Sequence, residues 1–130
     1  MPLAGLPLPV RFEAGAEIAR GRAHGRCEVG RAGCLGRDSQ THHRRARGMG
    51  GRRRAGLSVN RPSNLVRACT ACHGWIEANP TEADRLGLLH PGDSADPVWL
   101  RTLYGEGWWQ LTDEGDYGWV HDHDVAGPTG

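Results

Sequence analysis

The sequence contains no lysine and few of the aromatic residues that usually fill a protein core. All 16 basic residues are arginine, and the 130 residues include one Phe and two Tyr. No apolar run approaches the about 18 residues that cross a bilayer, so we expect no membrane span. The N-terminus lacks a basic start and a long apolar stretch, so we expect no signal peptide. A chain with so small a hydrophobic core usually needs an additional cross-link, either a bound metal ion or a disulfide.

Charge is divided unevenly along the chain, although the formal net charge is only +1. Residues 1–76 contain 14 arginines and four acidic residues, whereas residues 77–130 contain two arginines and 11 acidic residues. This asymmetry predicts that the first half faces a polyanion. We interpret the acidic half as a solvated surface.

Four cysteines form two pairs with different spacings. Cys69 and Cys72 are spaced C-x-x-C, and Cys27 and Cys34 are spaced C-x6-C with glycines in the loop. Thiols of an intracellular protein stay reduced, which favours a metal over disulfides. Four thiolates would complete a tetrahedral zinc ion and leave no position for substrate, so the expected site is structural. The alternative, two unlinked pairs of free thiols, would leave the core without a staple.

Apolar and turn-forming residues predict short helices and strands. We expect an irregular tail over 1–10, a helix over 11–23, a hairpin over 26–45 and an exposed loop over 44–56. In the first helix Phe12, Ala16, Ile18 and Ala19 would share one side. Short strands are expected at 57–59 and 65–66, with helices over 70–78 and 82–86, the latter capped by Thr81.

The segment after residue 90 is rich in tryptophan and turn residues. Short strands are predicted at 98–100, 107–111 and 117–120. We interpret them as a small antiparallel cap whose aromatic side chains bury against the rest of the chain. A base-stacking surface is the alternative, which the acidic surroundings disfavour.

The most informative pattern runs from Thr41 to Glu77. It reads H-H at residues 42–43, then N-L at residues 64–65, then C-T-A-C-H at residues 69–73. This pattern resembles the HNH endonucleases of the ββα-metal fold, and more closely those of actinobacterial phages. The resemblance covers roughly Arg20 to Leu89 well and the Trp-rich remainder loosely. One departure is Gly30, which stands where the family more often has the second cysteine of a C-x-x-C; we expect Cys34 to replace it.

The resemblance implies a role for each matching residue. His42 and His73 would hold one divalent metal ion, which could be Mg²⁺, Mn²⁺ or Ni²⁺. His43 would be the general base, and Asn64 would orient it through backbone contacts. The four cysteines match the structural zinc staple of many members. The expected products carry 5′-phosphate and 3′-hydroxyl ends.

Elementary chemistry agrees with these roles. Adjacent strand residues point to opposite faces, so His42 and His43 would perform different tasks. A neutral imidazole suits proton abstraction near physiological pH. Glu77 follows His73 by four residues and would share its helix face, as either a third metal ligand or a solvated residue. The other four histidines are interpreted as surface residues: His24, His90, His121 and His123.

Arginines around this pattern predict contact with DNA phosphates. Such contacts position DNA without reading its sequence. The alternative is a basic loop with no defined contacts. The expected set is Arg44, Arg45, Arg47, Arg52, Arg53, Arg54, Arg61 and Arg67.

Together these patterns predict an α+β protein with a structural zinc site of four cysteines and a Trp-rich β appendage, and the resemblance to HNH endonucleases implies a ββα-metal core. The expected division is a tail and short helix over 1–19, a nuclease domain over 20–90 and the acidic appendage over 91–130. The expected function is metal-dependent DNA cleavage in the cytoplasm of a phage-infected or lysogenic bacterium. A non-catalytic zinc-ribbon DNA-binding module is the rival, although it would need neither the histidines nor Asn64. A third alternative is a structural component of a phage packaging or recombination complex in which cutting is secondary, with terminase or portal proteins as partners.

Overall fold

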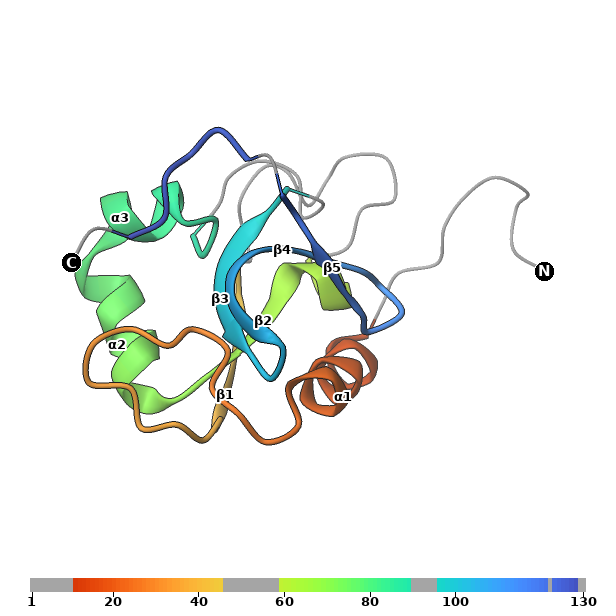
Figure 1. Cartoon of the computed structure of the whole chain (residues 1–130). Helices are drawn as coiled ribbons and strands as arrows, with labels where there is room; N and C mark the ends of the chain where they lie inside the picture. Colours follow the sequence, from red (N-terminus) through yellow and green to blue (C-terminus); the bar gives the residue numbers. More distant parts are fainter. Residues whose placement is uncertain (1–10, 46–58, 90–95, 122, 129–130) are drawn as a thin grey trace.

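The computed structural model describes residues 11–45, 59–89, 96–121 and 123–128 of the chain. These residues form three α-helices, one short 3-10 helix and two small antiparallel sheets (Figure 1). No helix in this described part is long and apolar enough to cross a membrane. The chain is therefore a mixed α+β protein, as the sequence predicts.

A two-stranded sheet followed directly by a helix forms the centre of the fold. Strand β1 (Gln40–His43) pairs antiparallel with β2 (Leu65–Ala68), with His42 opposite Val66. Helix α2 (Thr70–Ala78) follows β2 after a single intervening residue, Cys69, whose side chain accepts a hydrogen bond from the Cys72 amide and caps the helix. The short 3-10 helix η2 (Pro62–Asn64) leads into β2. This order places β1 and α2 close together, with β2 joining them.

Helix α1 (Phe12–Ala23) packs against β2 and η2, and glycine makes the close approach feasible. A Cβ at Gly15 would lie 1.9 Å from the carbonyl oxygen of Asn60. Ala16, Ala19 and Ala23 are buried, as small residues must be at so short a separation. The expected apolar side is wrong at Ile18, which is 38% exposed.

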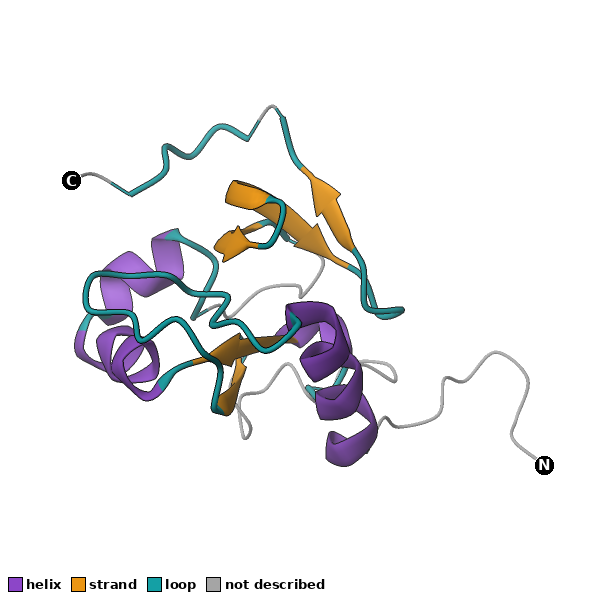
Figure 2. Ribbon diagram, turned by 60° about the horizontal axis from the view of Figure 1, so that its bottom comes forward, coloured by secondary structure: helices purple, strands orange, loops and turns teal. Residues whose placement is uncertain are grey.

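The Trp-rich segment forms a three-stranded antiparallel sheet in the order β3-β4-β5. Its strands are β3 (Val98–Thr102), β4 (Gly105–Leu111) and β5 (Tyr117–Trp119), close to the predicted positions. Figure 2 shows this sheet beside the β1–β2 pair and the helices. Val98, Leu100 and Trp109 belong to the same core cluster as Cys72 and Ile76. The aromatic side chains of the sheet are therefore partly buried in a core shared with β2 and α2.

Several other sequence predictions need correction. Residues 26–45 do not form a simple hairpin: they contain one isolated bridge, Arg26 to Arg37, and then β1, whose partner is β2. Helix α3 (Pro80–Arg85) starts at Pro80 rather than after Thr81, because proline fits the first turn, where the missing N–H costs nothing. Val59 lies in a turn. Three expected features lie wholly or partly outside the described residues: the tail at 1–10, residues 46–56 of the loop expected over 44–56, and strand residues 57–58.

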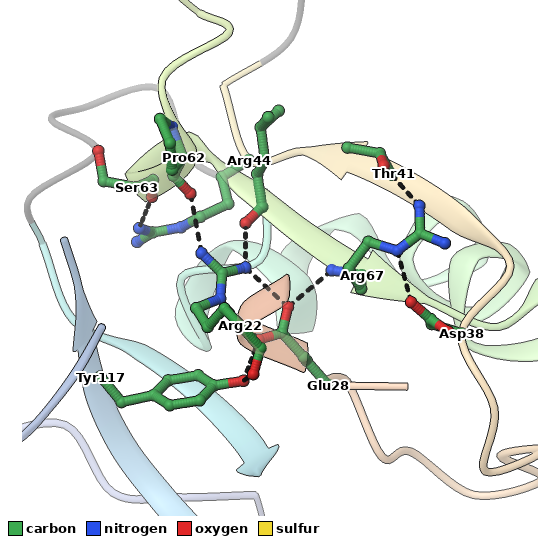
Figure 3. Close-up of polar contacts among 10 residues, drawn as sticks. Arg22, Glu28, Asp38, Thr41, Arg44, Pro62, Ser63, Arg67 and Tyr117 are labelled. Atoms are coloured by element: carbon green, nitrogen blue, oxygen red, sulfur yellow. Dashed lines mark hydrogen bonds and ion pairs between the residues drawn. The ribbon is translucent and has the colours of Figure 1, made fainter. Parts of the chain in front are cut away.

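A buried ion pair ties the two sheets and α1 together. Glu28 is 1% exposed and accepts two hydrogen bonds from Arg22 of α1, each of 2.8 Å. The amide of Arg67 in β2 donates to the same carboxylate at 2.8 Å, and the Tyr117 hydroxyl of β5 donates to it as well (Figure 3). Arg22 also donates to the carbonyl of Pro62. Because every partner comes from a different element, the carboxylate links segments that are far apart in the sequence.

Replacing Glu28 with alanine should destabilise the chain by ~3–5 kcal/mol, because it leaves the Arg22 guanidinium buried without its counter-charge. Urea denaturation followed by tryptophan fluorescence measures the change. The matched control is Glu106→Ala, which removes the exposed Arg31–Glu106 pair and should cost under about 1 kcal/mol. Equal effects of the two substitutions would contradict this role for Glu28.

Candidate functional site

The four cysteines converge on one point. The sulfur atoms of Cys27, Cys34, Cys69 and Cys72 all lie within 4.8 Å of one another. Cys69 and Cys72 come from the start of α2, and Cys27 and Cys34 come from the irregular segment after α1. Positive φ angles at Gly30 and Gly33, of 63° and 82°, turn that segment back on itself. The expectation that Cys34 joins the cluster in spite of the C-x6-C spacing is confirmed.

Backbone amides surround the sulfur atoms. The amide of Arg31 donates to Cys72 at 3.3 Å, that of Leu35 donates to Cys69 at 3.4 Å, and that of Gly36 donates to Cys34 at 3.3 Å. Although burial opposes ionisation, the amide donors lower the pKa of Cys69 to about 7. Burial raises the pKa of Cys27 and of Cys72. A set of four sulfur donors with amides aimed at them fits a bound cation that keeps the thiolates ionised, and it could hold a metal such as zinc.

A second group of polar side chains lines a cavity of about 340 Å³ between β1 and α2. Three histidines share it: His42 and His43 from β1, and His73 from α2. The rings of His42 and His73 are 5.3 Å apart at a steep angle of 62°. The remaining lining residues are Thr41, Ile76, Glu77 and Leu89. The structure thus brings residues 42, 43, 73 and 77 to one cavity.

Each of the two candidate ligand histidines has one ring nitrogen directed at an oxygen acceptor. His42 Nε2 lies 2.5 Å from the carbonyl oxygen of Leu88, and His73 Nδ1 lies 2.5 Å from the side-chain oxygen of Gln40. An oxygen acceptor requires the facing nitrogen to carry the proton. The other ring nitrogen of each residue, Nδ1 of His42 and Nε2 of His73, therefore has the lone pair that a metal needs.

Burial sets the protonation state of His42. It is the main cause that lowers the pKa of His42 to about 4, and the neighbouring His73 and His43 lower it further. The neutral form therefore dominates at physiological pH, and neutral imidazole is the form that binds metals. The His73 Nε2 atom lies 3.6 Å from a carboxylate oxygen of Glu77, whose side chain is 71% exposed. Among the described residues, His42, His73 and Glu77 do not meet the 4.8 Å mutual spacing that the cysteines meet.

The environment of His43 differs from that of His42. Its Nε2 atom lies 3.0 Å from the side-chain oxygen of Asn60, and its ring stacks on Phe12 with centroids 5.6 Å apart. Asn64 contacts the backbone two residues further on: its side chain accepts the Arg45 amide at 2.9 Å and donates to the Arg45 carbonyl at 3.1 Å. It also donates to the Val59 carbonyl at 2.7 Å. Asn64 thus fixes the backbone just after β1, two residues beyond His43.

The expected DNA contacts are wrong for the buried arginines. Arg44 is 0% exposed and donates to the carbonyls of Gly87 and Ser63 at 2.7 and 3.0 Å, so it joins chain segments. Arg67 is buried and pairs with Asp38 at 2.7 Å. Arg45 is buried as well. Arg61 is partly exposed and pairs with Asp113 at 3.0 Å. The remaining expected contacts, Arg47, Arg52, Arg53 and Arg54, lie outside the described residues.

The sequence interpretation missed three residues that touch the histidines. Gln40 lies two residues before His42, so strand alternation places both on one face, and this signal was present in the sequence. Asn60 and Phe12 had no such signal, because 17 residues separate Asn60 from His43 and Phe12 belongs to α1. Of the histidines interpreted as surface residues, His24 and His121 are exposed and His123 is half-buried against Trp108. His90 lies outside the described residues.

Comparison with protein-family models, with curated proteins and with solved structures gave no match for this chain.

Proposed function

We propose that this chain is a metal-dependent HNH-type endonuclease that hydrolyses phosphodiester bonds of DNA. The observation that carries the proposal is the joint lining of one cavity by His42, His43 and His73. The first two come from β1 and the third from α2, and β2 joins these elements in a strand–strand–helix order. A module that only binds DNA would need no such grouping.

The chemistry of the donors in this cavity supports a divalent cation as its ligand, although the three donor residues would have to move closer together to share one ion. His42 and His73 each have one nitrogen proton held by an oxygen, and Glu77 offers a carboxylate beside His73. These three residues would hold the ion, and Mg²⁺, Mn²⁺ and Ni²⁺ are the candidates. When bound, such an ion supplies neutralisation of charge on the phosphate and on the leaving oxygen.

His43 is the residue that we propose as general base. While its Nε2–H group donates a hydrogen bond to the side-chain oxygen of Asn60, its Nδ1 atom would take the proton from the attacking water. Asn64 fixes the backbone at Arg45 and so keeps the end of β1 in place. Phe12 covers one face of the imidazole and limits its rotation. Three contacts therefore position the proposed base: the ring stacks on Phe12, its Nε2 atom bonds to Asn60, and Asn64 fixes the backbone that follows it.

The cysteine cluster has a structural task in this proposal. It contains four protein donors, which satisfy tetrahedral zinc and leave no position for a substrate. Because Cys72 directly precedes His73, zinc binding at the start of α2 would also fix the position of that histidine.

The resemblance to phage enzymes extends the proposal to a biological setting. It suggests DNA processing in the cytoplasm of an infected or lysogenic bacterium, with terminase or portal proteins as partners. This extension is supported by the resemblance alone.

The test is cleavage of supercoiled plasmid by the purified, zinc-loaded chain. We expect nicking or linearisation when Mg²⁺, Mn²⁺ or Ni²⁺ is added, and none when these ions are left out. Withholding the ions is preferable to adding EDTA, because EDTA would also remove zinc from the cysteines. DNA binding without cleavage under every ion would favour the zinc-ribbon binding module instead.

A further inference from the structure

Two asparagines flank the proposed base, and their contacts differ. The Asn64 side chain bonds to main-chain atoms of Arg45 and Val59. Asn60 bonds to the ring itself, with 3.0 Å between its Oδ1 atom and His43 Nε2. An amide oxygen has no proton to donate, so this bond requires the proton to be on Nε2.

The position of Asn60 is held by helix α1. The absence of a side chain at Gly15 leaves room for the Asn60 carbonyl, since a Cβ there would lie 1.9 Å from that oxygen. One turn earlier in the same helix, Phe12 stacks on the His43 ring at an interplanar angle of 23°. Helix α1 thus contacts both the imidazole and the residue that bonds to it.

The segment that joins β4 to β5 also contacts the turn that carries Asn60. Asp113, which follows β4, accepts the Ser63 hydroxyl at 2.6 Å and pairs with Arg61 at 3.0 Å. Arg61 is the residue next to Asn60. The turn that carries Asn60 is therefore fixed between α1 and the segment that joins β4 to β5, which favours a single orientation of its amide.

We infer that Asn60 is a positioning residue that fixes the tautomer and the orientation of the His43 imidazole. The inference rests on the proposed function in assigning His43 as the base. In this arrangement Asn60 accepts a hydrogen bond from the Nε2–H group of His43, so the lone pair that receives the proton of the attacking water is on Nδ1. The other tautomer, with its proton on Nδ1, has its lone pair on the wrong nitrogen, and the bond to Asn60 disfavours it.

The kinetic test uses Asn60→Ala, which removes the acceptor, and Asn60→Asp, which keeps an oxygen in its place. For Asn60→Ala we expect kcat to fall roughly 10- to 100-fold, with KM changed by less than about 2-fold. Asn60→Asp should recover most of the lost kcat. The matched control is Asn79→Ala, which removes an exposed asparagine that bonds to the Trp75 carbonyl far from the cavity. An unchanged kcat in Asn60→Ala, or an equal loss in Asn60→Asp, would overturn the inference.

A spectroscopic test is independent of cleavage. Long-range ¹H–¹⁵N spectra of histidine-labelled, zinc-loaded protein distinguish protonated from unprotonated ring nitrogens, and a His43→Ala spectrum identifies the His43 signals. We expect Nε2 to carry the proton in the wild type and a mixture of tautomers in Asn60→Ala. The same tautomer in both proteins would overturn the inference. If the wild type cleaves no DNA, the proposed function fails and these spectra alone decide the role of Asn60.

Discussion

Removing zinc from the four cysteines should unfold the chain. Zinc binding by structural cysteine sites contributes about 10–16 kcal/mol of apparent free energy, which exceeds or matches the about 5–15 kcal/mol by which a domain is usually stable. In this chain Cys27, Cys69 and Cys72 all belong to the main core cluster. The segment from Cys27 to Gly36 contains no helix or strand of its own. Without a cation, burial would keep Cys27 and Cys72 as neutral thiols, and no metal bond would hold that segment to the start of α2.

The measurement combines zinc content with circular dichroism and tryptophan fluorescence during chelation. We expect one zinc per chain, and loss of the folded spectra as zinc leaves. Restoring zinc under reducing conditions should recover the spectra, which controls for irreversible damage. Cys72→Ser should prevent folding, because Cys72 is fully buried and lies in the first turn of α2. A zinc-free chain with unchanged spectra and stability would contradict the structural role of the cluster.

Replacing His43 with alanine should reduce the rate of DNA cleavage by about 10²–10⁴-fold, which is the usual contribution of a general base. The loss should be in kcat, because the proposed role of His43 is to activate the water and the cavity keeps His42 and His73. His43 is partly exposed, so its removal should cost little stability. Single-turnover cleavage of a labelled duplex at saturating metal measures the effect directly.

The matched control for this substitution is His24→Asn. His24 is an exposed histidine at the end of α1 with a positive φ of 53°, a conformation that asparagine tolerates. We expect this variant to cut DNA at the wild-type rate. Equal rates for wild type and His43→Ala would show that another residue removes the proton or that a contaminant cuts the DNA.

The convergence of the cysteines and the grouping of the histidines could be predicted from the sequence. Short spacing explains only part of each: C-x-x-C places two sulfurs at one helix start, and His73 follows directly. The joining of Cys27 and Cys34 was predicted from the four donors that zinc needs. The grouping of His42 and His43 with His73 was implied by the resemblance to HNH endonucleases. The strands of the Trp-rich sheet were also predictable, because Gly and Asp turns separate short apolar runs. Features that depend on short spacings along the chain could therefore be predicted from the sequence.

The roles of the arginines could not be predicted in this way. Counting charges gives the polarity of a segment, but burial depends on partners that are distant in the sequence. Arg44 meets the Gly87 carbonyl 43 residues away, and Arg22 meets the Leu65 carbonyl, also 43 residues away. In a chain with few large apolar residues, buried arginines fill space and satisfy carbonyls that would otherwise lose their hydrogen bonds.

The contacts of His43, the proposed base, could not be predicted from the sequence for a similar reason. The path of the chain from β1 to the turn at Asn60 cannot be deduced from spacing, and neither can the docking of α1. Gly15 carried no signal in the sequence beyond weakening the predicted helix. Only the close approach of the Asn60 carbonyl shows why glycine stands there.

The central claim is that histidines from β1 and α2 form one catalytic site. Its most direct test is the rate of Mn²⁺-supported plasmid nicking by wild type, His43→Ala and His73→Ala in parallel, with the zinc content of each protein confirmed. The account predicts rapid nicking by the wild type and near-complete loss in both variants, although the two residues come from different elements. Zinc-loaded variants that nick the plasmid as fast as the wild type would contradict it.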